Sequence, residues 1–329
     1  MNISEFESRN RIDCVSRALY IRERLSLLIE AEKSKQRKLP KMAILQVGDN
    51  FASNIYIRNK IKVADKIGID VDLKKFDDNI TECALIEHII SLNHNNDYCG
   101  MIVQLPLPQH INVVKVLSSI APNKDLDGLN PINAGLLHYS KYVPYCVDDV
   151  INQNIKHNIV FGKTLPFIPC TPLGCLDILQ QEEKRSTDNS MAVGQNSINQ
   201  NQFSIQSSNA VVIGNSNLVG KPIARLLTQS GATTTTIHSR SQNFDIFLQN
   251  ADIIVSATGV GQAIQNIKQN AIVIDVAIRK DKNGNICGDI EYEKVVQTNR
   301  ITPVPCGIGP MTISCLMLNY YLSLIFVNN

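Results

Sequence analysis

The 329-residue chain lacks several features that define common classes of protein. Its nine cysteines are an odd number, lie scattered along the chain and form no C-x-x-C pair, which argues against a disulfide framework or a zinc site. It also lacks an excess of charge of either sign, with 32 basic and 30 acidic residues. Neither nucleic acid nor an anionic membrane is therefore expected as its main partner. We expect reduced thiols, no metal site and a cytoplasmic location.

Long hydrophobic runs are absent as well. The first residues, MNISEFESRNRIDC, contain acids and no apolar core, so we expect no secretory signal. The most apolar run is ISCLMLNYYLSLIFV near the C-terminus. It is shorter than about 18 residues and includes an asparagine, which favours a buried core helix over a membrane span. An apolar fraction of 44% indicates a globular protein, and the length allows two domains.

The first part of the chain alternates strand and helix patterns. KMAILQVG, IDVDLKKF and CGMIVQLPLP have the character of strands, and TECALIEHIISL has helical spacing with Thr81 as its N-cap. A helix follows over about 112–119, and then the loop PNKDLDGLNPINAG. This β-α-β-α-β order predicts a parallel α/β sheet.

A second α/β run begins after residue 209. NAVVI, TTTTIHS, ADIIVSATG, AIVIDVAI and RITPVP each resemble strands, and short crossovers between them predict a small doubly wound sheet. The segment PCTPLGCLDIL predicts a helix with Thr171 as N-cap and Pro172 at its first position. Residues 180–209 are rich in Gln, Asn and Ser, which predicts a disordered polar insertion.

The stretch VVIGNSNLVGKP has the outline of a nucleotide-binding turn. Gly214 ends an apolar strand and Gly220 lies in the turn that opens a helix, where backbone amides suit a pyrophosphate. Ser216 and Val219 replace the second and third glycines of the usual G-x-G-x-x-G pattern. On its own the pattern leaves a nucleotide and a simple strand–helix turn about equally probable.

The end of the next strand bears on the choice of nucleotide. Dinucleotide sites that prefer NAD carry an acid there, on the ribose 2′-hydroxyl. This chain has His238, Ser239 and Arg240 instead, and no acid. A cation with a hydroxyl fits a 2′-phosphate, so NADP is favoured over NAD, with a solvated polar strand end as the alternative.

Tyr56 and Lys60 form a Y-x3-K pair that a helix would place on one face. Short-chain dehydrogenases contain the same spacing, but there it follows the glycine turn within one domain. Here the pair precedes Gly214 and lies in the other α/β run, which rules against that family.

The chain resembles the bifunctional methylenetetrahydrofolate dehydrogenase/cyclohydrolase family. The matching pieces occur in the family's order from about residue 45 to residue 318. They are VGDNFASNIYIRNK, GMIVQLPLP, NKDLDGLNPINAG, PCTPLGCLDIL, VVIGNSNLVGKP, SATG, VIDVAI, GDI and TPVPCGIGPMT.

This resemblance implies an α/β protein of two domains with the active site in the cleft between them. Residues 1–165 plus 310–329 would form the folate-site domain, and residues 166–309 the Rossmann-like doubly wound NADP domain. The resemblance also implies a homodimer formed through the NADP domains. It implies that 5,10-methylenetetrahydrofolate is oxidised with NADP⁺ and then hydrolysed to 10-formyltetrahydrofolate, a product used in purine biosynthesis.

The resemblance assigns roles to residues of the folate site. Lys60 matches the family's proton-carrying lysine, which must lose its proton readily to serve both steps of hydrolysis. Gln104 matches the glutamine that positions this lysine, and Tyr56 the tyrosine that packs along the folate rings. Ser53 lies near the same site, and Asp127 matches the aspartate that grips the pterin. Taken singly, each is an ordinary surface or turn residue.

The family's pattern also predicts contacts around the nicotinamide. Gly307 and Pro310, in PVPCGIGPMT, are expected beside the substrate, with Gly309 also allowing a close backbone approach. The predicted cofactor-binding residues are Gly214, Asn215, Ser216, Gly220, His238, Ser239, Arg240, Thr258 and Gly259.

Some positions depart from the family. Cys306 and Ala277 stand where it usually has glycine, and a Cβ would cost about 1 kcal/mol if either backbone needs a positive φ. Asn215 stands where many members have arginine. The alternatives are therefore a monofunctional dehydrogenase, perhaps NAD-linked, a folate-binding protein with a degraded cofactor site, or another two-domain dehydrogenase. The last would lack the tyrosine platform and the pterin-binding aspartate.

Overall fold

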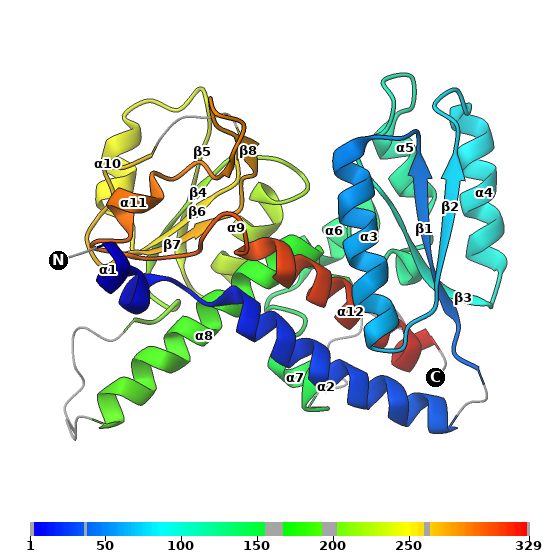
Figure 1. Ribbon diagram of the computed structural model, residues 1–329, viewed down its shortest axis with the longest axis horizontal. Coiled ribbons are helices and arrows are strands. Elements are labelled where there is room, and N and C mark those ends of the chain that lie inside the picture. The colour runs from blue at the N-terminus through cyan, green and yellow to red at the C-terminus, as the bar shows by residue number, and fades with distance from the viewer. Residues whose placement is uncertain (1–2, 36–37, 155–166, 193–202, 260–263, 328–329) are drawn as a thin grey trace. The chain divides into compact units, whose positions relative to one another are not determined.

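The computed structural model describes residues 3–35, 38–154, 167–192, 203–259 and 264–327, and it divides the chain into two compact units (Figure 1). Unit 1 consists of Met1–Ala18, Lys141–Val143 and Thr171–Thr312. Unit 2 consists of Leu19–Ser140, Pro144–Cys170 and Ile313–Asn329.

Unit 2 contains a three-stranded parallel sheet in the order β2-β1-β3. Its strands and the two helices that connect them are β1 (Lys41–Val47), α3 (Phe51–Lys66), β2 (Val71–Phe76), α4 (Glu82–His94) and β3 (Tyr98–Val103). The predicted β-α-β-α-β order is confirmed. Thr81 also caps α4 as predicted, because its side chain accepts a hydrogen bond from the Ala84 amide.

One core cluster of unit 2 lies against one face of this sheet. Alternate residues of β1, Ala43, Leu45 and Val47, pack with Met101 and Val103 of β3 against helices α4 and α5 (Val113–Ser119). Side chains of a strand alternate between faces, so this period of two assigns one face of β1 to α4 and α5.

The remaining elements of unit 2 include several that the sequence analysis did not predict. They are η1 (Pro122–Lys124), α6 (Pro131–Tyr139), α7 (Val147–Ile151) and most of α2 (Cys14–Lys35) and α12 (Ile308–Val327). Helix α6 begins inside the predicted loop. Asn130 caps it by accepting from the Ile132 amide at 2.6 Å, and Pro131 supplies the preset first turn.

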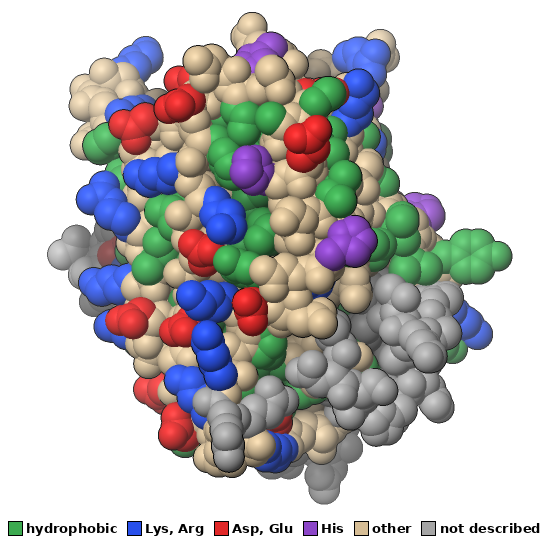
Figure 2. All heavy atoms as spheres, turned by 90° about the vertical axis from the view of Figure 1, so that its right-hand side faces the viewer, with side chains coloured by type: hydrophobic (Ala, Val, Ile, Leu, Met, Phe, Trp, Pro, Cys, Tyr) green, Lys and Arg blue, Asp and Glu red, His purple; other side chains and the backbone are tan. Residues whose placement is uncertain are grey.

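On the side of unit 2 shown in Figure 2, the described residues form no large patch of a single charge. Lys and Arg side chains lie among Asp and Glu side chains there, with apolar groups between them. This pattern agrees with the balanced composition.

Unit 1 contains a five-stranded sheet in the order β10-β7-β6-β4-β5. All of its pairings are parallel. Its strands are β4 (Asn209–Ile213), β5 (Thr233–Ile237), β6 (Ile253–Ser256), β7 (Ile272–Asp275) and β10 (Arg300–Ile301). These are the five predicted strands, and their order is that of a doubly wound sheet whose direction of growth reverses between β4 and β6.

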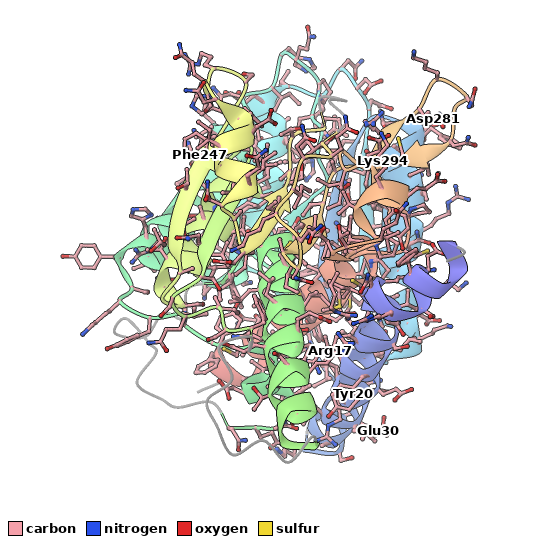
Figure 3. All side chains as sticks on the ribbon, turned by 90° about the vertical axis from the view of Figure 1, so that its left-hand side faces the viewer. Arg17, Tyr20, Glu30, Phe247, Asp281 and Lys294 are labelled. Atoms are coloured by element: carbon pink, nitrogen blue, oxygen red, sulfur yellow. The ribbon has the colours of Figure 1, made fainter. Side chains whose placement is uncertain are left out.

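Helices and a small hairpin surround this sheet. They are α1 (Ile3–Asn10), α8 (Cys170–Ala192), α9 (Gly220–Gln229), α10 (Phe244–Gln249), α11 (Tyr292–Val295) and the β8 (Arg279–Lys280) and β9 (Ile286–Cys287) pair. Figure 3 shows Phe247 on α10, Lys294 on α11 and Asp281 in the outer turn of the hairpin. The helix predicted to start at Pro172 begins two residues earlier, at Cys170, so Thr171 lies inside it and is not its N-cap.

Part of the segment predicted to be a disordered insertion is ordered. Helix α8 continues through 180–192, and residues 203–208 return to the sheet. The Glu183 carboxylate accepts from the Ser204 hydroxyl at 2.6 Å and from the Ile205 amide at 2.9 Å, and Ile205 is buried. Anchoring contacts of this kind do not show in composition. The rest of that prediction, residues 193–202, lies outside the described residues.

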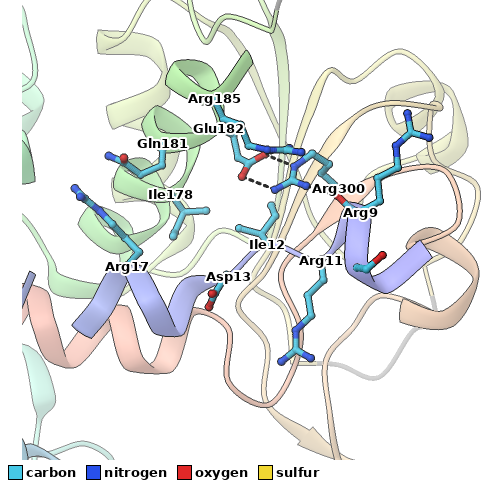
Figure 4. A pocket seen from close by; sticks show the side chains of 11 residues that line it. Arg9, Arg11, Ile12, Asp13, Arg17, Ile178, Gln181, Glu182, Arg185 and Arg300 are labelled. Carbon is cyan, nitrogen blue, oxygen red and sulfur yellow. Dashed lines mark hydrogen bonds and ion pairs between the residues drawn. The ribbon is translucent and has the colours of Figure 1, made fainter. Parts of the chain in front are cut away.

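The N-terminal segment differs from its predicted domain. Residues 3–18 pack with unit 1, where Arg17 pairs with Asp177 through two hydrogen bonds of 2.8 and 2.6 Å. Nearby, Figure 4 shows Glu182 held by Arg300 and Arg185 at a pocket of about 340 Å³. Arg300 also donates to the Arg9 carbonyl at 2.6 Å. These ion pairs connect α8 and β10 with the first residues of the chain.

The apolar C-terminal run forms helix α12. Ile308–Phe326 is long and apolar enough to cross a membrane by those measures alone, and 78% of its most apolar stretch is buried in the structure. Burial of this kind is typical of the core helix that the sequence predicts.

Candidate active site

The strongest candidate for catalysis is a buried lysine in unit 2. Lys60 lies on the inner face of α3, and its side chain is only 7% exposed. Its Nζ donates to Oε1 of Gln104 at 3.1 Å. A lysine this buried is uncommon unless it is paired, and here it donates to a neutral amide.

The amide of Gln104 has a fixed orientation. Gln104 follows β3 directly, and its own backbone amide donates to the Leu45 carbonyl at 2.8 Å. Its side-chain Nε2 donates to the Leu105 carbonyl at 2.8 Å, which leaves Oε1 to accept from Lys60. The predicted positioning role of Gln104 therefore has a geometric basis.

Tyr56 and Ser53 lie on the same helix. Asn50 caps α3 by accepting from the Ser53 amide at 3.0 Å, and the Ser53 side chain is buried. Tyr56 is 37% exposed, and partial burial raises the pKa of its hydroxyl. A raised pKa keeps the Tyr56 hydroxyl protonated. This property suits a ring on which the folate packs better than it suits a proton donor.

Asp127 and Lys60 both influence the pKa of the Cys170 thiol. The buried Cys170 thiol donates to the Leu126 carbonyl at 3.3 Å. Burial raises the pKa of the Cys170 thiol, Asp127 adds to that rise, and Lys60 opposes it. Asp127 and Lys60 therefore both influence one buried thiol, and a shared folate site for the two residues stays a prediction.

A neighbouring carboxylate was not predicted. Asp125 is 1% exposed and accepts from the Asn130 amide at 2.7 Å and from the Asn133 side chain at 3.0 Å. Burial raises its pKa to about 6. These contacts hold the turn that carries Asp127. The pair of acids in KDLDG was the available signal, but sequence alone did not show which of them faces inward.

In unit 1 the predicted cofactor residues gather at one end of the sheet. The Gly214 amide donates to the Ile237 carbonyl of β5, and the Ala257 amide donates to the Ile213 carbonyl of β4, both at 2.8 Å. The turns after β4, β5 and β6 are thus adjacent. They lie at the carboxyl ends of the strands where the sheet reverses, which is the usual ligand site of such sheets.

The glycine turn has little room for side chains. Gly214 has a φ of +115°, and a Cβ there would lie 2.7 Å from the Ala257 carbonyl oxygen. A Cβ on Gly220 would lie 2.2 Å from the Gly214 oxygen. Ser216 accepts from the Gly220 amide at 3.3 Å, while Asn215 and Ser216 are exposed. This narrow turn before α9 fits a pyrophosphate.

The other predicted cofactor residues border this turn. His238 accepts from the Arg240 amide at 3.2 Å through Nδ1, and Ser239 and Arg240 are exposed. After β6, the Thr258 hydroxyl and the Gly259 amide both donate to Asp289, at 2.7 and 3.1 Å. The described residues include no group of three His, Cys, Asp or Glu side chains that could hold a metal ion.

The two departures from glycine differ in the structure. Cys306 has a φ of +72°, in the left-handed region, whereas Ala277 has a negative φ. Only glycine fits at position 307 for a steric reason, because a Cβ there would lie 2.2 Å from the Pro303 carbonyl oxygen. Gly307 and Pro310 belong to unit 1, so the structure does not group them with Lys60, and their substrate contact stays a prediction.

Comparisons with known proteins agree with these two groups of residues. Residues 12–127 match the catalytic domain of tetrahydrofolate dehydrogenase/cyclohydrolase, and residues 194–325 match the NAD(P)-binding domain of the same enzymes. The chain belongs to the tetrahydrofolate dehydrogenase/cyclohydrolase family. It is 40% identical to the bifunctional protein FolD of Rickettsia akari over 313 residues, which cover 94% of both chains.

Solved structures show the same relationship. The bifunctional FolD enzyme of Campylobacter jejuni superposes with a TM-score of 0.80 at 32% identity, covering 95% of this chain and 98% of that one. The Trypanosoma brucei dehydrogenase-cyclohydrolase, solved with NADP and an inhibitor, gives a TM-score of 0.74 at 29% identity, with 97% of each chain covered. The predicted two-domain α/β fold and the resemblance to this family are confirmed.

Proposed function

We propose that this protein is a bifunctional one-carbon enzyme. It oxidises 5,10-methylenetetrahydrofolate with NADP⁺ and hydrolyses the resulting 5,10-methenyltetrahydrofolate to 10-formyltetrahydrofolate. The observation that carries the proposal is the buried Lys60, held by the oriented amide of Gln104 at 3.1 Å. A dehydrogenase without the hydrolytic step has little need for such a lysine.

Lys60 serves hydrolysis by moving protons. Water adds to the methenyl carbon, and a C–O bond forms as the water loses a proton to the neutral amine of Lys60. The C–N5 bond then breaks as the adduct hydroxyl loses its proton to solvent and becomes the formyl carbonyl, and the departing N5 receives a proton from the Lys60 ammonium. Because Oε1 of Gln104 accepts one Lys60 hydrogen, it aims the remaining nitrogen positions at the substrate.

The other residues of unit 2 bind and orient the folate. Tyr56 provides a neutral, partly exposed ring on which the folate ring system packs. Asp127 accepts hydrogen bonds from the pterin amino group and ring N–H, a charge-assisted contact that fixes the ring. Ser53, buried at the start of the same helix, lines this site.

The residues of unit 1 fit NADP. NADP⁺, when bound, accepts the hydride from the bridging carbon of the substrate. The turn from Gly214 to Gly220 would hold the pyrophosphate, with Asn215 and Ser216 at its exposed rim. His238, Ser239 and Arg240 would hold the 2′-phosphate, because the strand end offers cationic and hydroxyl groups and no acid.

One assay tests the proposal. The purified protein is mixed with 5,10-methylenetetrahydrofolate and NADP⁺ or NAD⁺, and reduced cofactor and methenyl folate are followed by absorbance. We expect reduction with NADP⁺ and no build-up of methenyl folate. Reduction accompanied by methenyl build-up contradicts the hydrolytic half. If neither cofactor is reduced, the dehydrogenase half is wrong.

Three further properties are part of the same proposal. We infer a homodimer formed through unit 1, a cytoplasmic location, and supply of formyl groups to purine biosynthesis. Family membership supports these inferences. Sedimentation equilibrium tests the first, and a mass of one chain at micromolar concentration would contradict it.

A further inference from the structure

The GDI motif contains a buried carboxylate that the proposed mechanism leaves unused. Asp289 is fully buried, and its Oδ2 accepts four hydrogen bonds from the end of β6. The donors are the Ser256 hydroxyl at 3.0 Å, the Thr258 amide at 3.1 Å, the Thr258 hydroxyl at 2.7 Å and the Gly259 amide at 3.1 Å. One charged oxygen thus fixes the whole SATG turn.

A second carboxylate holds the first in place. Asp275, at the end of β7, accepts from the Asp289 amide at 3.2 Å and from the Ile290 amide at 2.9 Å. A Cβ on Gly288 would lie 2.0 Å from Oδ2 of Asp275, so only glycine allows this close approach. Two residues of G-D-I are therefore explained: Gly288 allows the close approach to Asp275, and Asp289 fixes the turn after β6.

The turn fixed by Asp289 borders the nucleotide turn. Between them, the Ala257 carbonyl lies 2.7 Å from the position of a Cβ on Gly214. A shift of residues 257–259 would therefore alter the space available to a pyrophosphate. Asp289 itself is not accessible, so it can act on a ligand only through Thr258 and Gly259.

We propose that Asp289 is a positioning residue for the dinucleotide, acting through the Thr258–Gly259 turn. This inference rests on the proposed function, since it concerns the same NADP site. Loss of the carboxylate leaves two amides and two hydroxyls without their shared acceptor, and the turn relaxes to satisfy them. Nucleotide binding then weakens, while hydrolysis of the folate, which needs no nucleotide, is retained.

The test compares two variants with a matched control. Asp289→Ala removes the acceptor, whereas Asp289→Asn can keep one oxygen in the same place without the charge. Asp281→Asn is the control: Asp281 accepts from the Asn283 and Asn285 amides, both at 2.8 Å, in the exposed hairpin turn (Figure 3). The measurements are KM and kcat with NADP⁺, NADP⁺ affinity by calorimetry, and hydrolysis of methenyltetrahydrofolate without nucleotide.

We expect Asp289→Ala to raise KM and Kd for NADP⁺ by about tenfold or more, and Asp289→Asn by about two- to fivefold. Hydrolysis should stay within about twofold of wild type, and Asp281→Asn should change neither. Unchanged NADP⁺ affinity in both Asp289 variants would overturn the proposal, as would a parallel loss of both activities in Asp289→Asn. Failure of the proposed function is distinct, because the wild type would then reduce no NADP⁺.

Discussion

Lys60 is the residue on which the hydrolytic step depends. Its Nζ is held at 3.1 Å from Gln104, and methionine keeps the length of the side chain without a proton to transfer. We expect Lys60→Met to lower the rate of methenyltetrahydrofolate hydrolysis by about a hundredfold or more, as loss of a general acid–base group does. The matched control is Lys62→Met, at an exposed position of the same helix. Normal hydrolysis by Lys60→Met would show that the assigned role is wrong.

Cys306 and Ala277, the two positions where the family resemblance leads us to expect glycine, provide a matched pair. Cys306 has a φ of +72°, so glycine there should relieve backbone strain and raise the free energy of unfolding by about 1 kcal/mol. Ala277 is not in the left-handed region, so Ala277→Gly should lower the free energy of unfolding by about 0.4–1 kcal/mol. Urea unfolding measures both. Changes of the same sign would contradict the strain at Cys306.

Asp125 makes stability depend on pH. Burial raises its pKa to about 6 from 3.8, so the folded protein binds this proton more tightly than the unfolded chain. The resulting stability is fully present below pH 3.8 and is lost as pH rises through about 6, by about 3 kcal/mol in total. Asp125→Asn should remove this dependence. Unfolding in urea between pH 4 and 7 would show parallel curves for wild type and variant if the assignment is wrong.

At the level of elements, one ion pair connects α8 with β10. Arg300 donates to Glu182 through Nε and through Nη2, the latter at 2.7 Å, and the Glu182 side chain is 7% exposed. Arg300→Met would leave this carboxylate buried with only Arg185, at 3.5 Å. We expect a loss of about 3 kcal/mol in the free energy of unfolding, because a buried charge loses its main partner.

The double variant provides the control for that prediction. Glu182→Met combined with Arg300→Met removes both charges and should cost less than Arg300→Met alone. Additive losses would mean that the two side chains are not coupled.

Elements also show where sequence patterns are reliable. The strands of both sheets follow from runs of apolar or β-branched residues, or from alternation of apolar and polar residues, bounded by turns. Thr81 follows from the local rule for helix caps. The end of α8 and the whole of α6 could not be predicted in this way. Helix α8 continues through a polar segment because Glu182 and Glu183 find partners far along the chain, in Arg300 and Ser204.

At the level of the whole molecule, nucleotide binding should stabilise the fold. A ligand that binds only the folded state adds about 2.7 kcal/mol at one hundred times its Kd. We expect NADP⁺ to raise the midpoint of thermal unfolding of the wild type. Gly214→Ala should abolish that increment, because its Cβ would lie 2.7 Å from the Ala257 oxygen.

Gly284→Ala is the matched control for this experiment. Gly284 also has a positive φ, +84°, but a Cβ there would meet nothing within 4 Å. It should lower stability through backbone strain and still show the full NADP⁺ increment. An increment retained by Gly214→Ala would place the nucleotide elsewhere.

By itself, the sequence determined the α/β class and the two successive sheets, because periodicity and short motifs are local properties. The residues of the folate site were predicted from the family resemblance. Tertiary structure decided what depends on partners distant in the chain. It showed that Gln104 offers its oxygen to Lys60, that Asp125 is the buried acid of KDLDG, and that residues 3–18 pack with unit 1. It also revealed that Asp289 fixes the turn after β6. Burial and hydrogen bonding between remote segments decide such roles, and one-dimensional patterns do not contain them.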